Sequence, residues 1–372
     1  MRTLLFATVF ASLLAPPRCA TADDSETAQW KATVDKAVAY LKSSQNADGS
    51  WSTPPANRGV TGIIVTGLIR SGIGPDQEPT AKGLAFIESL INEKEGHIAG
   101  KDASPGLTNY ITSINVMALA AAGRDAKYKS VIKDAVAYLK KYQWDDSEGK
   151  TPNDDYYGGA GYGGNKSRPD LSNTAFFLEA LKSAGLGSDD EAFRKAGVFV
   201  SKCQNFKSEH NKAPWAAKND DGSFIYTGAN GGENRTDTDD FRGYGSMTYA
   251  GIKSLIYAGV GKDDPRMKKA LEWIGKNYTV DANPGMPPQL AQRGLYYYLH
   301  TMAKAMEALG LEKFTDSKGA KHSWKVDITS ALAKRQQPNG TWKNDTDRWM
   351  EGDPNLVTGY ALMALGYCKP AK

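Results

Sequence analysis

The chain of 372 residues has little cysteine, no excess of one charge and no extended apolar stretch. With only 3 Cys it is not a disulfide-stapled small protein, and 38 Gly without a triplet period exclude a collagen-like chain. Its 46 Lys and Arg against 42 Asp and Glu give a net charge of +4, too near neutrality for electrostatic binding of nucleic acid. A hydrophobic content of 40% excludes disorder, so the sequence predicts a globular protein.

One short apolar run lies near the N-terminus. Arg2 precedes the run Leu4–Ala15, and the small-residue triplet Ala20–Ala22 follows it. A positive start, a short apolar run and an A-x-A site are typical of a secretory signal peptide. A bilayer span needs ~20 apolar residues, and no stretch of the chain reaches that length. We therefore expect residues 1–22 to be a signal peptide cleaved near Ala22, and an exported mature chain without a transmembrane segment.

The mature chain contains a repeated amphipathic segment. Ala37–Lys42 and Ala135–Lys140 share an A-V-A-Y-L-K sequence, and a glutamine follows each at the same distance, at Gln45 and Gln143. Charged residues on one side of each segment predict helices with one face in solvent. Further copies of this pattern lie at 80–91, 196–204, 270–274 and 326–336.

A second, more apolar segment alternates with the first. Ser172–Thr174 and Ser246–Thr248 open two copies, and each threonine has a leucine seven residues later. Because these segments are apolar on nearly every face, we expect them to be buried helices. Thr61, Thr112 and Thr358 mark three more copies, and an irregular sixth runs from 295 to 310.

Six outer and six inner helices in strict alternation predict an all-α fold, an α6/α6 toroid formed by residues 23–372 as one domain. Ring closure buries the apolar faces that a single repeat leaves exposed, whereas an open solenoid is the alternative architecture. The connections from outer to inner helices are long, as at 144–170 and 205–245. We therefore expect a functional cavity at the end where the inner helices begin.

The two cysteines of the mature chain are not expected to pair. Cys203 ends an outer helix and Cys368 ends an inner one, which places them at opposite ends of the barrel. Both are therefore predicted to be buried free thiols.

Two segments read Q-x-x-x-G-x-W, at 45–51 and 336–342. They resemble the QW motif of the squalene-hopene cyclase, oxidosqualene cyclase and protein prenyltransferase superfamily. The stretches 158–174 and 243–249 also resemble sequences of this superfamily. This resemblance spans the mature chain and implies an α/α toroid. Glutamine can tie a helix end to a neighbouring backbone, glycine allows a tight turn and tryptophan packs between repeats, so the motif is expected to be structural.

The segment 237–240 reads D-T-D-D, which resembles the proton-donating D-x-D-D motif of class II terpene cyclases. By this resemblance Asp239 is the catalytic acid, and Asp237 and Asp240 orient it. Clustered carboxylates resist simultaneous ionisation, which keeps a proton on one of them. The alternative is a solvated loop, because Phe241–Gly245 separates these residues from the next inner helix.

A zinc site of the prenyltransferase type is not expected. His300 lies near the start of the fifth inner helix, but no cysteine lies close enough in the sequence to complete a ligand set. We predict that His300 is a hydrogen-bonded helix residue and that His97, His210 and His322 are loop or surface residues. No metal and no cofactor is expected, since protonation of an alkene needs neither.

Aromatic residues are frequent on the predicted inner helices, and aromatic faces can stabilise a carbocation as they stabilise ammonium ions. Packing against the outer helices is the alternative role for any one of them. The predicted substrate-binding residues are Tyr162, Phe177, Tyr249, Tyr297 and Tyr360.

Three functions remain open. The first is proton-initiated cyclisation or binding of a polyprenyl or triterpene chain, a hydrophobic isoprenoid-like small molecule. The second is an exported carbohydrate-active enzyme, a lyase or glycosidase. The third is a non-catalytic binding scaffold on the same toroid. The sequence leaves the oligomeric state open. The carbohydrate hypothesis would draw its acid and base from Asp154, Asp155, Glu233 and Asp239.

Overall fold

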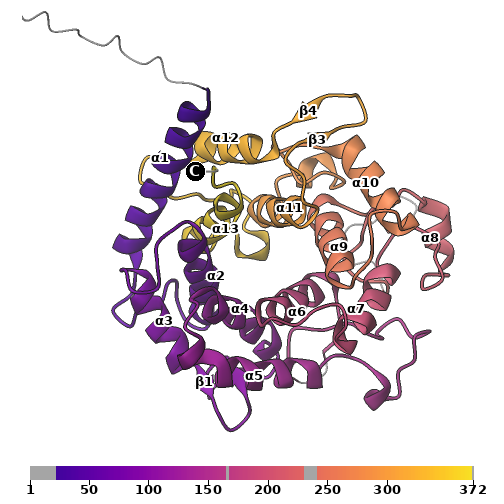
Figure 1. Cartoon of the computed structure of the whole chain (residues 1–372), viewed down its shortest axis with the longest axis horizontal. Coiled ribbons are helices and arrows are strands. Elements are labelled where there is room, and N and C mark those ends of the chain that lie inside the picture. Colours follow the sequence, from indigo (N-terminus) through magenta and orange to yellow (C-terminus); the bar gives the residue numbers. More distant parts are fainter. Residues whose placement is uncertain (1–21, 165–166, 230–240, 371–372) are drawn as a thin grey trace, which may run out of the picture.

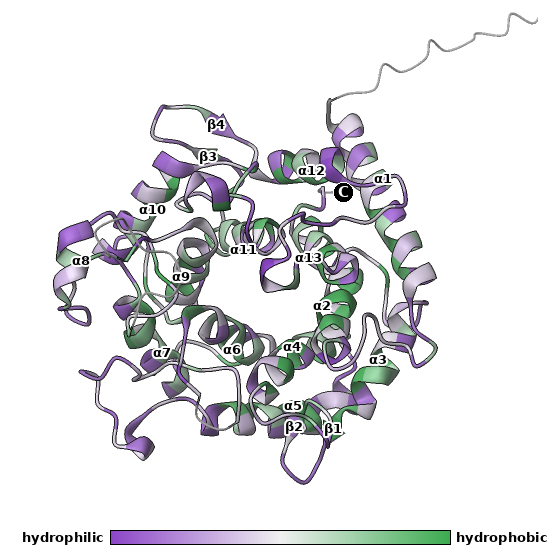
Figure 2. Cartoon of the chain, turned by 180° about the vertical axis from the view of Figure 1, so that it is seen from behind, coloured by the Kyte–Doolittle hydropathy of each residue, from purple (hydrophilic) through white to green (hydrophobic). Residues whose placement is uncertain are grey.

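The computed structural model describes residues 22–164, 167–229 and 241–370, and in this part of the chain twelve long helices alternate between two concentric rings (Figure 1). A thirteenth helix, α8 (Pro214–Asn219), is a short addition on the outside. The alternation confirms the predicted all-α, α6/α6 toroid. The outer helices carry most of the hydrophilic residues, whereas the inner helices are more hydrophobic (Figure 2).

The inner ring consists of six helices that each pack against the next, and the last contacts the first. This contact between α13 and α2 closes the ring and excludes the open solenoid. The inner helices are buried on almost all sides, as their apolar sequences predict. They are α2 (Asn57–Arg70), α4 (Thr108–Ala121), α6 (Leu171–Ser183), α9 (Gly245–Tyr257), α11 (Leu295–Ala308) and α13 (Pro354–Tyr367).

The outer ring alternates with the inner one along the chain. Its first and last helices, α1 and α12, contact one another, and α1 also packs on α13. Closure is therefore made twice, once in each ring. The outer helices are α1 (Ala22–Ser44), α3 (Thr80–Ser89), α5 (Asp125–Lys141), α7 (Glu191–Lys202), α10 (Pro265–Asn277) and α12 (Trp324–Arg335).

The connections contain the little sheet that the described residues form, two antiparallel hairpins of two-residue strands. Ile91 pairs with Ile98 in the first hairpin, and Phe314 pairs with His322 in the second. The strands are β1 (Ile91–Asn92), β2 (His97–Ile98), β3 (Phe314–Thr315) and β4 (Lys321–His322), and the 3-10 turns are η1 (Asp146–Glu148), η2 (Pro288–Leu290) and η3 (Arg348–Met350).

Four glutamines at the ends of outer helices join neighbouring repeats. Each side-chain amide donates one hydrogen bond to a carbonyl of its own loop and one to a carbonyl of the next outer helix or its N-cap, at 2.8 to 3.1 Å. Gln336 donates to Thr33 of α1, so this contact ties the last repeat to the first. The four are Gln45, Gln143, Gln204 and Gln336.

Two buried tryptophans complete these turns. The indole N–H of Trp51 donates to the Leu41 carbonyl and that of Trp342 donates to the Leu332 carbonyl, each at 2.8 Å. The indole rings thereby fill the space between repeats while their one polar group stays satisfied.

The two cysteines of the described chain, Cys203 and Cys368, are free thiols and both are buried, as predicted. Burial raises the pKa of each thiol, which keeps it protonated and inert. Among the described helices, none combines the length and the apolar character that crossing a bilayer requires.

Candidate functional site

A cavity of about 520 Å³ lies at the end of the barrel where the inner helices begin. All six inner helices, or the loops leading into them, contribute to its wall. The lining is predominantly apolar, and α2 and α4 provide an aliphatic side formed by Val60, Ile63, Ile111 and Ile114. The long loops thus enclose the cavity at the end of the barrel that the sequence predicts.

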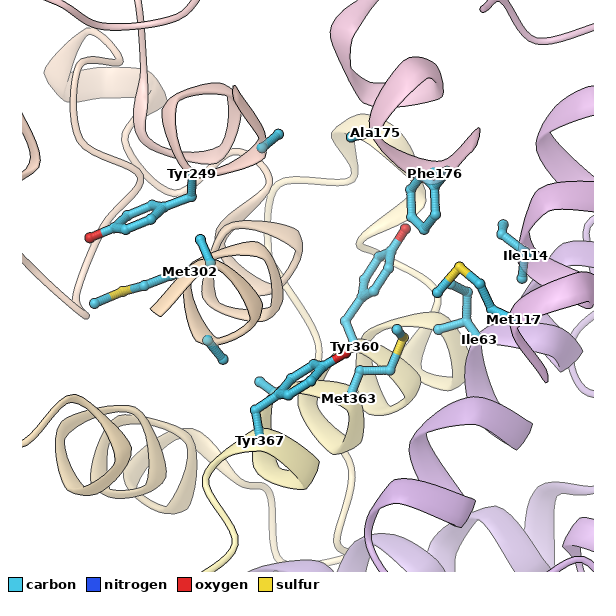
Figure 3. Close-up of a cluster of buried hydrophobic side chains, with 14 of the residues drawn as sticks. Ile63, Ile114, Met117, Ala175, Phe176, Tyr249, Met302, Tyr360, Met363 and Tyr367 are labelled. Carbon is cyan, nitrogen blue, oxygen red and sulfur yellow. The ribbon is translucent and has the colours of Figure 1, made fainter. Parts of the chain in front are cut away.

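Aromatic side chains form the other side of the cavity. Tyr360 of α13 points toward Phe176 of α6 across the barrel interior (Figure 3). Tyr297 packs edge-on against Tyr360, with ring centroids 5.7 Å apart, and Tyr110 packs edge-on against Phe176 at 5.3 Å. Such edge-to-face pairs hold the rings in fixed orientations around the cavity.

Side chains satisfy backbone amides at the starts of α6 and α9. Asp170 accepts a hydrogen bond from the Asn173 amide at the start of α6, at 2.8 Å. The side-chain carbonyl of Asn283 accepts one from the Ser246 amide of α9, at 3.0 Å. These caps occupy donors that would otherwise attract an anion to the cavity.

Glu351 is the one carboxylic acid that lines the cavity among the described residues. It is fully buried, and its Oε1 accepts a hydrogen bond of 2.8 Å from the Tyr297 amide at the start of α11. Its Oε2 accepts one of 2.7 Å from the Asn344 side chain. Burial raises the pKa of Glu351 to about 7, and the bonds from the α11 amides and Asn344 oppose that shift. Glu351 therefore carries a proton in a substantial fraction of molecules at neutral pH.

The two residues before Glu351 adopt an unusual backbone conformation. Trp349 and Met350 have φ angles of +60° and +65°, in the left-handed region, and both side chains are exposed at the cavity wall. The indole of Trp349 packs over Gly294, where a Cβ atom would lie 3.1 Å from the ring. Left-handed non-glycine residues cost about 1 kcal/mol or more each, and such strain is common at functional sites.

A second buried carboxyl, Asp170, lies behind the tyrosines of the cavity wall. Burial raises its pKa to about 6, against the opposing effect of its hydrogen bonds to Asn173 and Tyr226. The Tyr226 and Tyr162 hydroxyls are 3.0 Å apart, and both tyrosines line the cavity. Asp170 therefore lies close enough to this pair of phenols for Tyr226 to influence its pKa.

The residues predicted to bind substrate divide into two groups. Tyr162, Tyr297 and Tyr360 line the cavity. Tyr249 does not: its ring packs against Tyr298, with centroids 5.8 Å apart, and its hydroxyl has no partner among the described residues. Phe177 is also absent from the cavity wall, and its side chain lines a small gap between α4 and α6.

The predicted acids Asp237, Asp239 and Asp240 lie outside the described residues, so their role as proton donors stays a prediction. Sequence reasoning missed Glu351 and Trp349. A signal was present in Trp349-Met350-Glu351, an apolar pair and an acid placed a few residues before an inner helix.

Two expectations about histidine are wrong. His300 is buried on α11, and neither ring nitrogen has a hydrogen-bond partner among the described residues, whereas a satisfied side chain was expected. His97 is not a surface residue: β2 buries it, and its ring lies 3.3 Å from the Asn92 amide. In the described part of the chain, no three His, Cys, Asp or Glu side chains converge in a way that could hold a metal ion.

The carboxylates proposed for carbohydrate chemistry are not brought together in the described chain. Asp154 is half-buried and accepts hydrogen bonds from Thr151, and Asp155 is exposed beside it. Neither lines the cavity, and Glu233 and Asp239 lie outside the described residues. The described cavity wall thus offers one carboxyl where a glycosidase uses a pair.

No protein-family model matches the sequence, and no curated protein matches it. Several solved structures match the fold. The type II terpene cyclase MstE from Scytonema has a TM-score of 0.56 at 13% identity, over 92% of this chain and 99% of that one. A protein from Actinoplanes has a TM-score of 0.52 at 15% identity, over 91% and 99%. A glycosidase variant has a TM-score of 0.52 at 13% identity, over 95% and 100%. At these identities the likeness establishes the α/α toroid fold.

Proposed function

We propose that the barrel binds an apolar, isoprenoid-like chain in its cavity and that Glu351 protonates this chain to begin a cyclisation. One observation carries the proposal: an apolar, aromatic-lined cavity contains a single buried carboxyl among its described lining residues.

The cavity has the properties that an isoprenoid chain requires. Its volume of about 520 Å³ falls within the range of small-molecule sites. The aliphatic side chains of α2 and α4 bury hydrocarbon, and the rings of Tyr110, Tyr297 and Tyr360 present aromatic faces to it. An aromatic face stabilises a cation by about 2 kcal/mol or more when water is excluded.

Glu351 is the proton donor in this proposal. In its protonated form it gives its proton to one alkene carbon, and the carbon beside it becomes a cation that a second alkene attacks, which forms the ring bond. The cyclised cation then loses a proton, so the reaction changes no oxidation state. The α11 amides and Asn344 stabilise the remaining carboxylate, which makes Glu351 a stronger acid than an unsupported buried carboxyl.

The structural neighbours support the choice of substrate class. MstE has been crystallised with geranylgeranyl dihydroxybenzoate, named as its substrate, and with merosterolic acid A, named as its product. A prenyl chain of that kind is a suitable first probe for the present cavity.

The test is incubation of the protein with geranylgeranyl dihydroxybenzoate and geranylgeraniol in D2O, followed by mass spectrometry. Proton-initiated cyclisation adds one deuterium from solvent to each product molecule. We expect a labelled cyclic product from the wild type and its loss in Glu351→Gln. The comparison variant is Asp239→Asn: if this variant alone abolishes the product, the acid lies in the D-T-D-D segment and the assignment to Glu351 fails.

Binding is measured separately from chemistry by quenching of tryptophan fluorescence, since Trp349 lines the cavity. We expect saturable quenching by geranylgeraniol that is lost in Trp349→Phe, with Trp144→Phe as the control. Saturable binding without product would support a non-catalytic scaffold, and no binding would reject both proposals.

We also propose that the protein acts after export, which the N-terminal pattern of Arg2, an apolar run and Ala20–Ala22 supports. Mass spectrometry of the secreted protein would show an N-terminus close to Asp23.

A further inference from the structure

Three buried charged residues lie on three successive inner helices, two turns beyond the cavity. They are Glu179 of α6, Lys253 of α9 and Lys304 of α11, with exposed fractions of only 1%, 3% and 6%. Seven residues are two helical turns, about 10 Å of rise, and return to the same helix face. Each charged residue lies seven positions after a cavity-lining residue of its own helix, namely Ser172, Ser246 and Tyr297.

The charges in this group do not balance. One oxygen of Glu179 contacts the Lys253 ammonium and the other contacts that of Lys304, so a single carboxylate serves two lysines. Arg70 adds a third cation close enough to act electrostatically on the neighbouring His300, together with both lysines. Glu179 is the one carboxylate in direct contact with the two lysines among the described residues, so positive groups outnumber it in a region where an unpaired buried charge costs several kcal/mol.

The same region contains several buried polar atoms without a hydrogen-bond partner in the described part of the chain. Both ring nitrogens of His300, Nε of Arg70 and the hydroxyl of Tyr367 have no hydrogen-bond partner among the described residues. His300 is 1% exposed, and Tyr367 is also buried. Buried polar groups are nearly always paired, so several unsatisfied groups around a positive charge indicate a missing acceptor.

Arg70 connects this group to the outside of the molecule. It is the last residue of α2, is partly exposed, and its guanidinium lies 4.7 Å from the centre of the Tyr367 ring. The Lys304 ammonium lies 5.8 Å from the same ring. Arg70 therefore brings this group toward the surface at the end of the barrel where the inner helices end, opposite the cavity mouth.

We propose that Arg70, Lys253, His300, Lys304 and Tyr367, here called the basic cluster, bind a phosphate-type oxyanion that enters from this end of the barrel. A tetrahedral oxyanion carries negative charge and several acceptor atoms, which suit a group in which positive side chains outnumber the carboxylate and N–H and O–H donors lack partners. Charge-assisted hydrogen bonds of this kind are about twice as strong as neutral ones.

The protonation behaviour of the cluster agrees with this arrangement. Burial and the nearby Lys304 hold the pKa of Lys253 well below its usual range. Burial, together with Lys253, Lys304 and Arg70, does the same for His300, which stays neutral and keeps one N–H donor. An anion among these groups would relieve the repulsion that both shifts express.

The test is isothermal titration of the full chain, in a phosphate-free buffer of fixed ionic strength, with inorganic phosphate. We expect saturable binding, weakened at least tenfold in Lys253→Met and in Lys304→Met. The matched control is Lys182→Met, because Lys182 is an exposed lysine in the last turn of α6 at the same end of the barrel. The control should bind phosphate as the wild type does.

Thermal unfolding separates a binding site from a merely structural charge group. Phosphate should raise the wild-type melting temperature, and an equal ionic strength of chloride should not. Lys253→Met leaves Glu179 paired with one lysine, so it should fold normally and lose only the response to phosphate. The proposal is overturned if the wild type shows no saturable heat, if chloride acts as phosphate does, or if Lys253→Met and Lys182→Met respond equally.

Discussion

The two ends of the barrel are lined by the same six helices and have opposite chemistry. Where the inner helices begin, long loops enclose an apolar cavity whose one described carboxyl, Glu351, is held by the start of α11. Two turns further along, Glu179 holds two lysines, and the connections to the outer ring are mostly short. Loop length thus determines which end is hollow, and helix side chains determine which end is charged.

The difference also shows how each end manages a buried charge. Glu351 can lose its charge by binding a proton, and three helical amides and Asn344 stabilise the carboxylate when it does not. Glu179 is held by two cations and compensates their charge only in part. The stability of the charged end therefore depends on the balance between Glu179 and its lysines. The stability of the cavity end depends on whether Glu351 is protonated.

Removal of Glu179 should have the largest effect on stability. Glu179→Gln leaves Lys253 and Lys304 buried without a counter-charge, and we expect a loss of about 3 to 5 kcal/mol in the free energy of unfolding. Urea denaturation followed by circular dichroism measures it. The triple variant that combines Glu179→Gln with Lys253→Met and Lys304→Met should recover most of this loss; a triple variant as unstable as Glu179→Gln would show that packing, not charge, dominates this end.

The free energy of unfolding should depend on pH through Glu351, the buried carboxyl at the cavity end. The pKa of Glu351 is raised from 4.5 to about 7, so its stabilising contribution is complete below pH 4.5 and is lost as the pH rises through 7. A shift of this size corresponds to about 3 kcal/mol. The difference in unfolding free energy between wild type and Glu351→Gln should therefore change by that amount between pH 4.5 and 7.5.

Asp170 provides the control for that titration, because it is also buried with a raised pKa, to about 6, but is not a cavity-lining residue. Asp170→Asn should remove a pH dependence of the unfolding free energy whose midpoint lies about one pH unit below that of Glu351. A flat difference profile for Glu351→Gln would contradict the assignment of its raised pKa.

Most of the fold could be predicted from the sequence because each helix carries its own periodic pattern. The apolar segments opened by Thr61, Thr112 and Thr358 became inner helices, and the segments ending in Gln45 and Gln143 became outer ones. The position of the cavity followed from loop length. These are local properties, and local sequence determines them.

The residues that form the site could not be predicted from the sequence in the same way. Glu351 reaches the cavity because Trp349 and Met350 take left-handed conformations, which no residue-type preference indicates. Lys253 and Lys304 look like solvated charges in isolation, and only the packing of consecutive inner helices brings them onto Glu179. Residues that meet through tertiary contacts leave no spacing signal along the chain.

Two glycine-to-alanine substitutions, one at each end of the barrel, test how tightly the two ends are packed. They have the smallest expected effects on the free energy of unfolding. At Gly59 in α2, a Cβ atom would face the cavity, with its nearest neighbours in Ile114 and Ile111 at 3.8 and 3.9 Å. Gly59→Ala should therefore gain helix propensity without a clash and raise the free energy of unfolding by up to about 1 kcal/mol.

At Gly366 in α13, a Cβ atom would lie 2.6 Å from the Cβ of Arg70, so α2 and α13 must separate at the charged end. Overpacking costs about 1 to 3 kcal/mol, which exceeds the propensity gain, and Gly366→Ala should be destabilising. It should also weaken phosphate binding, because it displaces Arg70, whereas Gly59→Ala should leave that binding unchanged. Equal stability of the two variants would mean that the charged end is no more tightly packed than the cavity end, and the contrast between the two ends would then rest on charge alone.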